Sequence, residues 1–296
     1  MNESQNINLP FVKSIFHPSD FSEESEQAFA HALAIALIRK TKLTVLHFDN
    51  EYNDVGWKRF PAVRKTLERW GLLEKGSPRS AVLDKLGISA EKVGIQGRNP
   101  INTTLSYLDK HPTDLIVLAT KGREGLARWI SSSVAEQMAR KSETMTLFVP
   151  DSTRGFVSLE DGHISLQRIL IPVDHHPSPH SAIVYATRAA RAAGKPPVEI
   201  ILIHVNDSKD MPVIDLPESP SWSWKTLKRS GKVVDEITAA ANECNVDLIA
   251  MTTQGHKGVF DAIRGSVTEQ VLRQAPCPVL AVPMSRVSET AGGEEE

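Results

Sequence analysis

One sequence pattern occurs twice in this chain of 296 residues, and that repeat constrains the fold more than any other feature. Segments of the first half recur in the second half in the same order, and the later ones share one constant offset. The matching pairs are residues 14–20 and 168–174, 46–48 and 203–205, 114–122 and 247–255, 133–137 and 266–270, and 147–150 and 280–283. Because chance rarely produces such order, we predict two tandem copies of one domain, the second with a shorter middle.

Each copy alternates short apolar runs with segments of helical spacing. The apolar runs that predict buried strands are residues 15–17, 43–48, 115–119 and 146–149 in the first copy and 169–171, 198–205, 248–251 and 279–282 in the second. Residues 22–40 and 181–193, and segments that begin near Ser133 and Ser266, are expected to be helices. This alternation is typical of a doubly wound, Rossmann-like α/β domain with a parallel sheet.

The middle of the two copies differs. Large apolar residues between positions 57 and 73 recur at helix-like spacing, whereas residues 207–221 contain three prolines and cannot form a continuous helix. The second copy is therefore expected to lack a middle helix. We expect a first domain at residues 1–154, a linker at 155–165, a second domain at 166–286 and a disordered acidic tail at 287–296.

The loop after the strand at 248–251 allows two interpretations. Ser266 and Glu269 have the spacing of a capping box, and Gly265 would then simply permit the turn before the helix. Alternatively, Gly255 and Gly265 let the backbone approach a phosphate, which the free N–H groups at the helix start would bind. The position of the loop, after the carboxyl end of a parallel strand, favours a ligand site.

Together these motifs resemble the universal stress protein family in both halves. The resemblance depends on the strand that ends at Pro172 and Asp174, the second strand with His204, the Asp-Leu-Ile strand at Asp247, and the closing residues 275–283. It implies a five-stranded parallel sheet in each half, and two halves that pack as an internal pseudo-dimer, with a homodimer of chains as a further expectation.

ATP-binding members of this family have the pattern G-x2-G-x9-G-[ST]. The second half matches it at Gly255, Gly265 and Ser266 but has Thr252 at the first glycine position. Carried over by position, the implied adenosine residues are Pro172, Val173, Asp174 and Val205. The implied ribose and phosphate residues are Met251, Thr252, Gly255, Gly265, Ser266, Val267 and Thr268. The expected ligand is ATP, with ADP or AMP as alternatives and Mg²⁺ as a companion ion.

The first half departs further from the pattern. It has Ala119 and Ser132 at the first and third glycine positions, and Glu124 adds negative charge to the loop. A side chain at Ser132 would stand where the backbone should meet a phosphate, so this half is expected to bind ATP poorly. Asp20 remains, which leaves open an adenine-sized pocket without a phosphate site, or a half that serves packing alone.

Charge and composition exclude several function classes. The net charge of −2 disfavours broad nucleic-acid or anionic-membrane binding, and no apolar run is long enough to cross a bilayer. Cys244 and Cys277 form no close pair, which indicates a reducing, cytoplasmic setting. His175, His176 and His180 are expected to be loop residues and not metal ligands, because no matched set of further ligands lies nearby.

The sequence thus favours a cytoplasmic stress-response protein that senses or stores adenine nucleotide. No nucleophile–base pair or acidic metal cluster flanks the loop, so at most slow ATP hydrolysis is expected. Two alternatives stay open at this point: a slow ATPase, and an interaction scaffold whose pockets no longer bind nucleotide.

Overall fold

The computed structural model describes residues 12–19, 24–49, 61–96, 100–120, 144–150, 155–193, 197–206, 210–253 and 267–284. Within these residues the predicted strand–helix alternation is present in both halves. The first half contains β1 (Ser14–Pro18), α1 (Glu24–Arg39), β2 (Lys42–Asp49), α2 (Val63–Arg69), α3 (Ala81–Leu86), β3 (Ser89–Gln96), α4 (Pro100–Lys110), β4 (Leu115–Thr120) and β5 (Met145–Pro150). The second half contains β6 (Arg168–Pro172), α7 (His180–Ala192), β7 (Val198–Val205), β8 (Trp222–Arg229), α8 (Val233–Glu243), β9 (Leu248–Thr253), α9 (Val267–Gln274) and β10 (Val279–Pro283).

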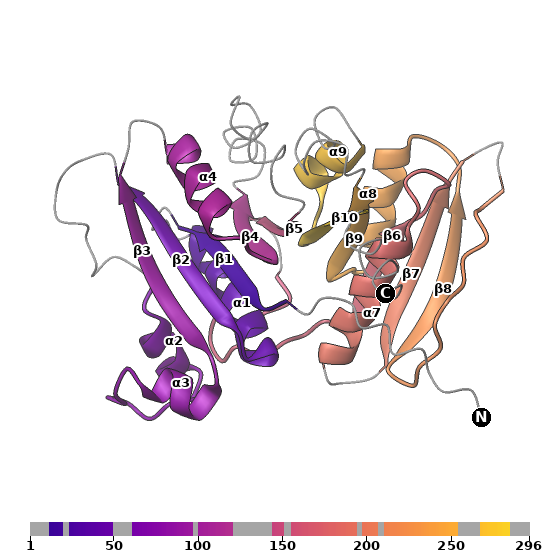
Figure 1. Ribbon diagram of the computed structural model, residues 1–296. Coiled ribbons are helices and arrows are strands. Elements are labelled where there is room, and N and C mark those ends of the chain that lie inside the picture. Colours follow the sequence, from indigo (N-terminus) through magenta and orange to yellow (C-terminus); the bar gives the residue numbers. More distant parts are fainter. Residues whose placement is uncertain are drawn as a thin grey trace, which may run out of the picture.

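The strands form one continuous sheet in the order β3-β2-β1-β4-β5-β10-β9-β6-β7-β8 (Figure 1). Within each half the neighbouring strands are parallel, so the predicted five-stranded parallel sheet is confirmed for both copies. The halves join through their last strands, which are antiparallel and place Leu147 opposite Leu280. This joint fits the internal pseudo-dimer that the family resemblance implies.

Burial along the sheet explains why the strands are continuous apolar runs. Every residue of β5, β9 and β10 is buried, and these strands lie in the middle of the sheet. The edge strands β3 and β8 are mostly exposed or half-buried, and both contain charged residues. Strands covered on both faces need apolar side chains on both, whereas edge strands tolerate charge.

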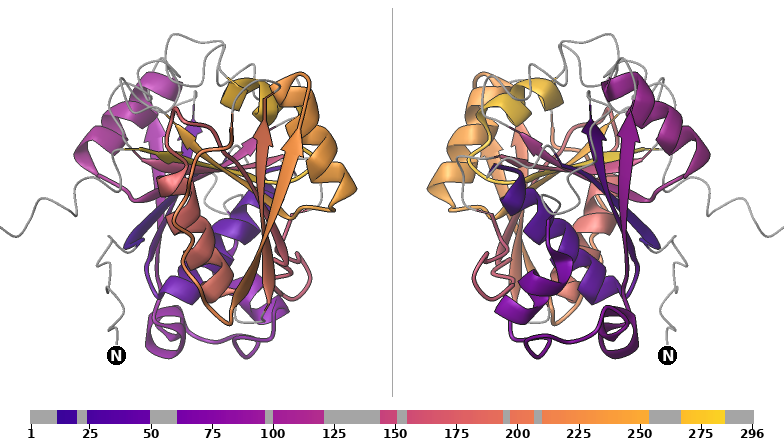
Figure 2. Two further views of the ribbon diagram at one scale, coloured as in Figure 1. Left: turned by 90° about the vertical axis from the view of Figure 1, so that its right-hand side faces the viewer. Right: turned by 90° about the vertical axis from the view of Figure 1, so that its left-hand side faces the viewer.

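Helices cover both faces of the sheet (Figure 2). One apolar cluster joins one face of the sheet to α1, α2, α3 and α7, and it spans both halves. A second cluster joins the opposite face to α4, α8 and α9. The sheet is therefore the middle layer of a three-layer α/β/α structure, as the doubly wound prediction requires.

The segments between the second and third strands differ in the two copies, as predicted. The first half has two short helices there, and α2 begins at Val63, just after Pro61, which has no N–H to donate. Trp57 and Phe60, which the periodicity placed in a longer helix, lie outside the described residues. In the second half, residues 210–220 contain no helix and run beside β8, with Met211, Ile214 and Leu216 packed against the first apolar cluster (Figure 1).

Residues 155–165 connect the two halves and are here named the connector hairpin. An antiparallel bridge joins Val157 to Ile164, and the N–H of Ser165 donates to the carbonyl of Phe156 at 2.8 Å. Phe156 and Val157 are buried in the first apolar cluster together with α1. The connector therefore packs on the first half as an ordered element with its own hydrogen bonds.

Candidate functional site

The carboxyl ends of three neighbouring strands bring most of the implied adenosine and ribose residues to one edge of the sheet. β6 lies between β7 and β9, so Pro172, Val205 and Thr252 stand at or near the ends of adjacent strands. In Figure 1 these strands end at the upper side, where α9 also lies. Ligands of open α/β sheets bind at this kind of edge.

The predicted phosphate loop follows β9 in the sequence. Gly255, Gly265 and Ser266 lie outside the described residues, as does the corresponding first-half loop with Ser132. Val267 and Thr268 form the first turn of α9. The structure therefore gives the strand side of the site and the start of the helix.

A repeated histidine fixes the turn after the first strand of each half. The Nδ1 of His204 is 2.9 Å from the carbonyl of Val173, and the Nδ1 of His47 is 2.7 Å from the equivalent carbonyl of Ser19. The N–H of Val173 also donates to the carbonyl of Ile203 at 2.9 Å. These buried hydrogen bonds give His204 a structural role. They fix the backbone of Val173, the residue directly before Asp174.

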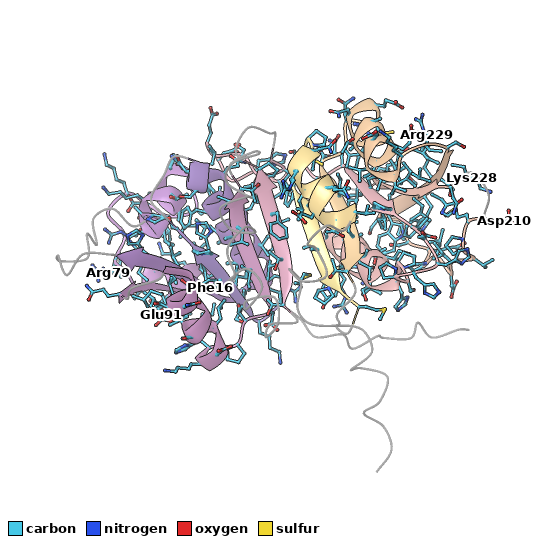
Figure 3. The ribbon with its side chains drawn as sticks, turned by 90° about the horizontal axis from the view of Figure 1, so that it is seen from above. Phe16, Arg79, Glu91, Asp210, Lys228 and Arg229 are labelled. Carbon is cyan, nitrogen blue, oxygen red and sulfur yellow. The ribbon has the colours of Figure 1, made fainter. Side chains whose placement is uncertain are left out.

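Asp174 follows this fixed turn with an exposed side chain. Its Oδ1 accepts a hydrogen bond from the N–H of His175 at 2.7 Å, and the Nε2 of His175 is 3.0 Å from the carbonyl of Asp210. Figure 3, viewed from above, labels Asp210 at the outer edge of the second half. The carboxylate therefore stands at the sheet edge on a loop that is bonded to residues 210–220.

Thr252, which replaces the first glycine of the pattern, is a strand residue with a partner of its own. Its Oγ1 accepts a hydrogen bond from the N–H of Ala182 at 3.1 Å, and the residue is 7% exposed. Ala182 is in the first turn of α7, where N–H groups have no partner within the helix. Among the described residues, positive φ outside glycine occurs at Lys40 and Asn245, so Thr252 adopts no backbone conformation that needs a glycine.

We expect Thr252→Ala to lower the free energy of unfolding by about 1 kcal/mol, because the buried N–H of Ala182 loses its acceptor. Thr252→Ser, which keeps a hydroxyl, should recover most of this loss. Urea denaturation followed by circular dichroism measures both variants. An alanine variant as stable as the parent would show that the contact does not cap α7.

Asp114 and Asp247, which directly precede the buried strands β4 and β9, occur at matching positions of the repeat and have the same structural role. The Oδ2 of Asp247 accepts the N–H groups of Gln167 at 2.8 Å and Arg168 at 2.9 Å. The Oδ2 of Asp114 accepts those of Lys13 and Ser14 at 2.9 and 3.1 Å. In each half the acid therefore fixes the start of the first strand beside the later strand and takes no part in the ligand edge.

Other sequence candidates do not form a further site in the described part of the chain. No group of three or more His, Cys, Asp or Glu residues is placed there to hold a metal ion, and none of the described helices is long and apolar enough to cross a membrane. An open hollow of about 470 Å³ lies against Trp222 and Trp224, at the end of β8 opposite the ligand edge. Both indole N–H groups donate to the carbonyl of Pro217, which assigns these rings to packing.

Comparison with known proteins gives one consistent family. The model of the universal stress protein family matches residues 12–150 and 221–283. A universal stress protein of Mycobacterium tuberculosis is 24% identical, over 90% of this chain and 95% of that protein. The crystal structure of a universal stress protein from Archaeoglobus fulgidus covers 92% of this chain and 98% of its own, with 19% identity and a TM-score of 0.57. A putative universal stress protein from Pseudomonas aeruginosa covers 94% and 96%, with 15% identity and a TM-score of 0.57.

Proposed function

The chain belongs to the universal stress protein family, and we propose that its C-terminal half binds an adenine nucleotide, with ATP as the expected ligand. The observation that carries this proposal is the convergence of β6, β7 and β9 at one edge of the sheet. That edge has an apolar turn held by His204, the exposed carboxylate of Asp174, and the start of α9, which follows the glycine loop in the sequence.

Each part of the nucleotide has a chemical partner in this proposal. Pro172 and Val205 offer a half-buried apolar surface to the base beside the backbone of Val173, whose side chain is buried in the core. The carboxylate of Asp174 accepts from an amine or a ribose hydroxyl. Met251 and the backbone of Thr252 lie beside the ribose. The side chain of Thr252 is directed to Ala182, so it leaves the strand backbone as the surface that faces the ligand.

The phosphates are assigned to the loop and to α9. The glycines Gly255 and Gly265 allow close approach of the backbone, and Ser266, Val267 and Thr268 offer N–H groups at the positive end of the helix dipole. A Mg²⁺ ion would accompany the bound triphosphate and neutralise part of its charge.

We propose a cytoplasmic sensor or regulator in the stress response, with at most slow ATP hydrolysis, built from domains at residues 1–154 and 166–286. Because Ser132 replaces the close-approach glycine of the first half, one nucleotide per chain is proposed. A homodimer of chains is a further proposal.

Titration calorimetry with ATP tests the proposed site. Asp174→Ala should weaken binding about tenfold, because one hydrogen bond to a charged acceptor is lost. Asp20→Ala, the matched change in the first half, should leave the affinity unchanged. If the parent protein does not bind ATP, the proposed function is refuted. If Asp20→Ala and not Asp174→Ala weakens binding, the nucleotide is assigned to the first half.

A further inference from the structure

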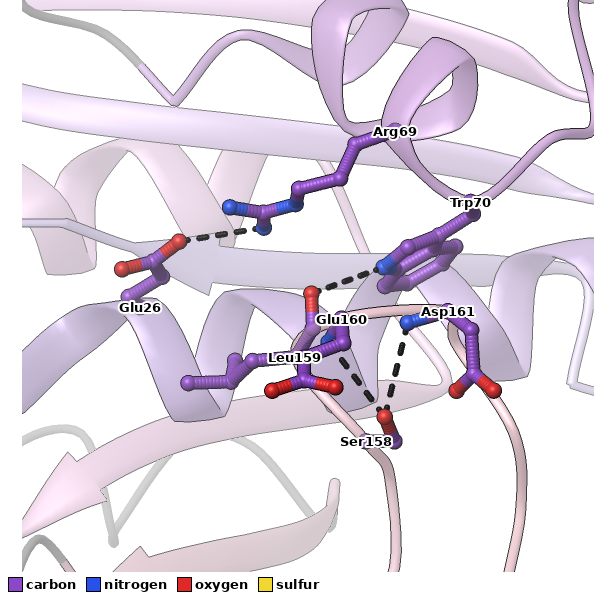
Figure 4. Close-up of polar contacts among 7 residues, drawn as sticks. All are labelled: Glu26, Arg69, Trp70, Ser158, Leu159, Glu160 and Asp161. Atoms are coloured by element: carbon purple, nitrogen blue, oxygen red, sulfur yellow. Dashed lines mark hydrogen bonds and ion pairs between the residues drawn. The ribbon is translucent and has the colours of Figure 1, made fainter.

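The connector hairpin is bonded to the first half at its start and near its turn. Near its turn, the Nε1–H of Trp70 donates to the carbonyl of Leu159 at 3.1 Å (Figure 4). At its start, the Nε2 of Gln27 in α1 donates to the carbonyl of Val157 at 2.9 Å. The fit is close, because a Cβ at Gly155 would lie 2.3 Å from Gln27, and a Cβ at Gly162 would lie 2.5 Å from the Trp70 ring. The hairpin thus covers a defined surface made by α1 and Trp70.

The central contact of this surface is the buried imidazole of His31, which is 0% exposed. Its Nδ1 lies 2.7 Å from the carbonyl of Gln27 and donates to it, and its Nε2 accepts the N–H of Phe156 at 3.1 Å. The Phe156 ring packs edge-on against the imidazole at 4.4 Å. Both ring nitrogens are therefore used, and the geometry requires the neutral ring with its proton on Nδ1.

A second proton on this ring would have nowhere to bond. Nε2 faces an N–H donor, so protonation would set two donors against each other in a buried place and remove the acceptor of Phe156. The imidazolium could be hydrated only if the hairpin moved away from α1. We propose that the connector hairpin is an acid-sensitive element that detaches from α1 when His31 is protonated, while the paired strands β5 and β10 keep the two halves joined.

The pKa of His31 is shifted in the direction that this proposal requires. Burial, opposed by the hydrogen bond to Gln27, lowers the pKa of His31 from 6.5 to about 4. A lowered pKa means that the contact is fully stabilising above pH 6.5 and loses its stabilisation as the pH falls toward 4. If the detached state has the ordinary pKa, the opening constant rises about twentyfold between pH 7 and pH 5 and about a hundredfold between pH 7 and pH 4.

The charged groups around the hairpin do not set the pKa of His31. Glu26 and Arg69 form an exposed ion pair at 3.1 Å beside it, and Asp161 and His163 lie in its turn (Figure 4 shows all but His163). The hydrogen bond from Ser158 lowers the pKa of Asp161 below its ordinary value of 3.8, so Asp161 titrates only in stronger acid. Within the described residues, none of these charges contributes to the lowered pKa of His31.

Detachment would expose an apolar surface that the folded chain covers. Phe156, Val157 and Trp70 are each at most 6% exposed, and they would become accessible together. Tyr185 occupies the position in α7 that corresponds to His31, so this helix has no histidine to titrate at that place. The response is therefore confined to the first half and does not require the nucleotide site.

Hydrogen–deuterium exchange of the full-length chain between pH 7 and pH 4, with labelling times corrected for the intrinsic pH dependence, tests the proposal. The amides of Phe156, Ser158, Gly162 and Ser165 are hydrogen-bonded in the hairpin and should lose about a hundredfold in protection. Amides of β5 and β10 should stay protected over the same range. Unchanged hairpin protection at pH 4, or loss in step with β5 and β10, would overturn the proposal.

A matched pair of variants isolates His31. His31→Gln keeps an acceptor near the position of Nε2 but cannot be protonated, so its hairpin protection should change less than about threefold from pH 7 to pH 4. His111→Gln is the control, because the Nδ1 of His111, an exposed residue directly after α4, bonds the carbonyl of Tyr107 in the same way. That control should follow the parent. A His31→Gln curve that also follows the parent would contradict the proposal, and if this variant does not fold, the parent curve decides alone.

Discussion

Gly265→Val is expected to lower the affinity for ATP by at least about a hundredfold while the far-ultraviolet circular dichroism stays that of the parent. In the proposed site, a valine side chain would keep a phosphate away from the backbone N–H groups at the start of α9. The loss of two or more charge-assisted hydrogen bonds accounts for an effect of this size. Titration calorimetry measures the affinity, and urea denaturation shows that the fold is retained.

The repeat supplies the control for this variant. Ser132→Val makes the same change at the corresponding position of the first half and should leave the affinity within about twofold of the parent. Equal affinities for Gly265→Val and the parent protein would mean that the glycine serves the turn alone. The capping-box interpretation of the loop would then be sufficient.

Asp247→Ala is expected to lower the free energy of unfolding by about 3 kcal/mol. Asp247 is 4% exposed, and its carboxylate accepts the N–H groups of Gln167 and Arg168 where β6 begins. Removal of the acid leaves both N–H groups without that acceptor, and hydrogen bonds to a charged group are the stronger kind. Urea denaturation monitored by tryptophan fluorescence gives the value.

Two further variants show whether the carboxylate itself is responsible. Asp247→Asn retains one acceptor oxygen and should cost about 1 kcal/mol, whereas Asp114→Ala removes the half-buried equivalent and should cost less than Asp247→Ala. Both acids lie away from the ligand edge, so these variants should bind ATP with the affinity of the parent even where their free energy of unfolding is lower. If Asp247→Ala lowers the free energy of unfolding by less than about 1 kcal/mol, Asp247 does not have the proposed role in fixing β6.

Most of the fold follows from local patterns that the repeat makes easy to recognise. The apolar runs predicted as strands lie within the observed strands, because a strand buried on both faces needs an uninterrupted apolar run. The predicted second strand of the second copy, residues 198–205, coincides with β7. Comparison of the copies also predicted the absence of a middle helix in the second half, since prolines at 212, 217 and 220 exclude it.

The parts that escaped prediction depend on contacts between distant segments. Burial of His31 could be expected in an apolar helix, but the partner of its Nε2, Phe156, lies 125 residues away. The bonds from Asp247 and Asp114 cross 80 and 100 residues to the strand starts that they hold. Sequence patterns also missed α3, which is only six residues long, and the edge strand β3, which is mostly polar and largely exposed or half-buried.

Sequence comparison named the residues of the candidate site, but it could not give the geometry of those that the structure describes. Thr252 conflicts with the family pattern only if its position requires positive φ, and the extent of β9 decides this. A sequence cannot state where a strand ends to within one or two residues. The partner of the Thr252 hydroxyl, the N–H of Ala182, lies 70 residues earlier in the chain, so it too was beyond local inference.

The most direct test of nucleotide binding is the content of the purified protein. The chain is purified without added nucleotide, denatured, and the released small molecules are separated by chromatography and quantified against protein. About one adenine nucleotide per chain is the expected result, and its saturation at one after incubation with ATP would agree with a single site in the second half. Absence of released nucleotide, together with no detectable ATP binding by the same preparation, would contradict nucleotide binding by this protein.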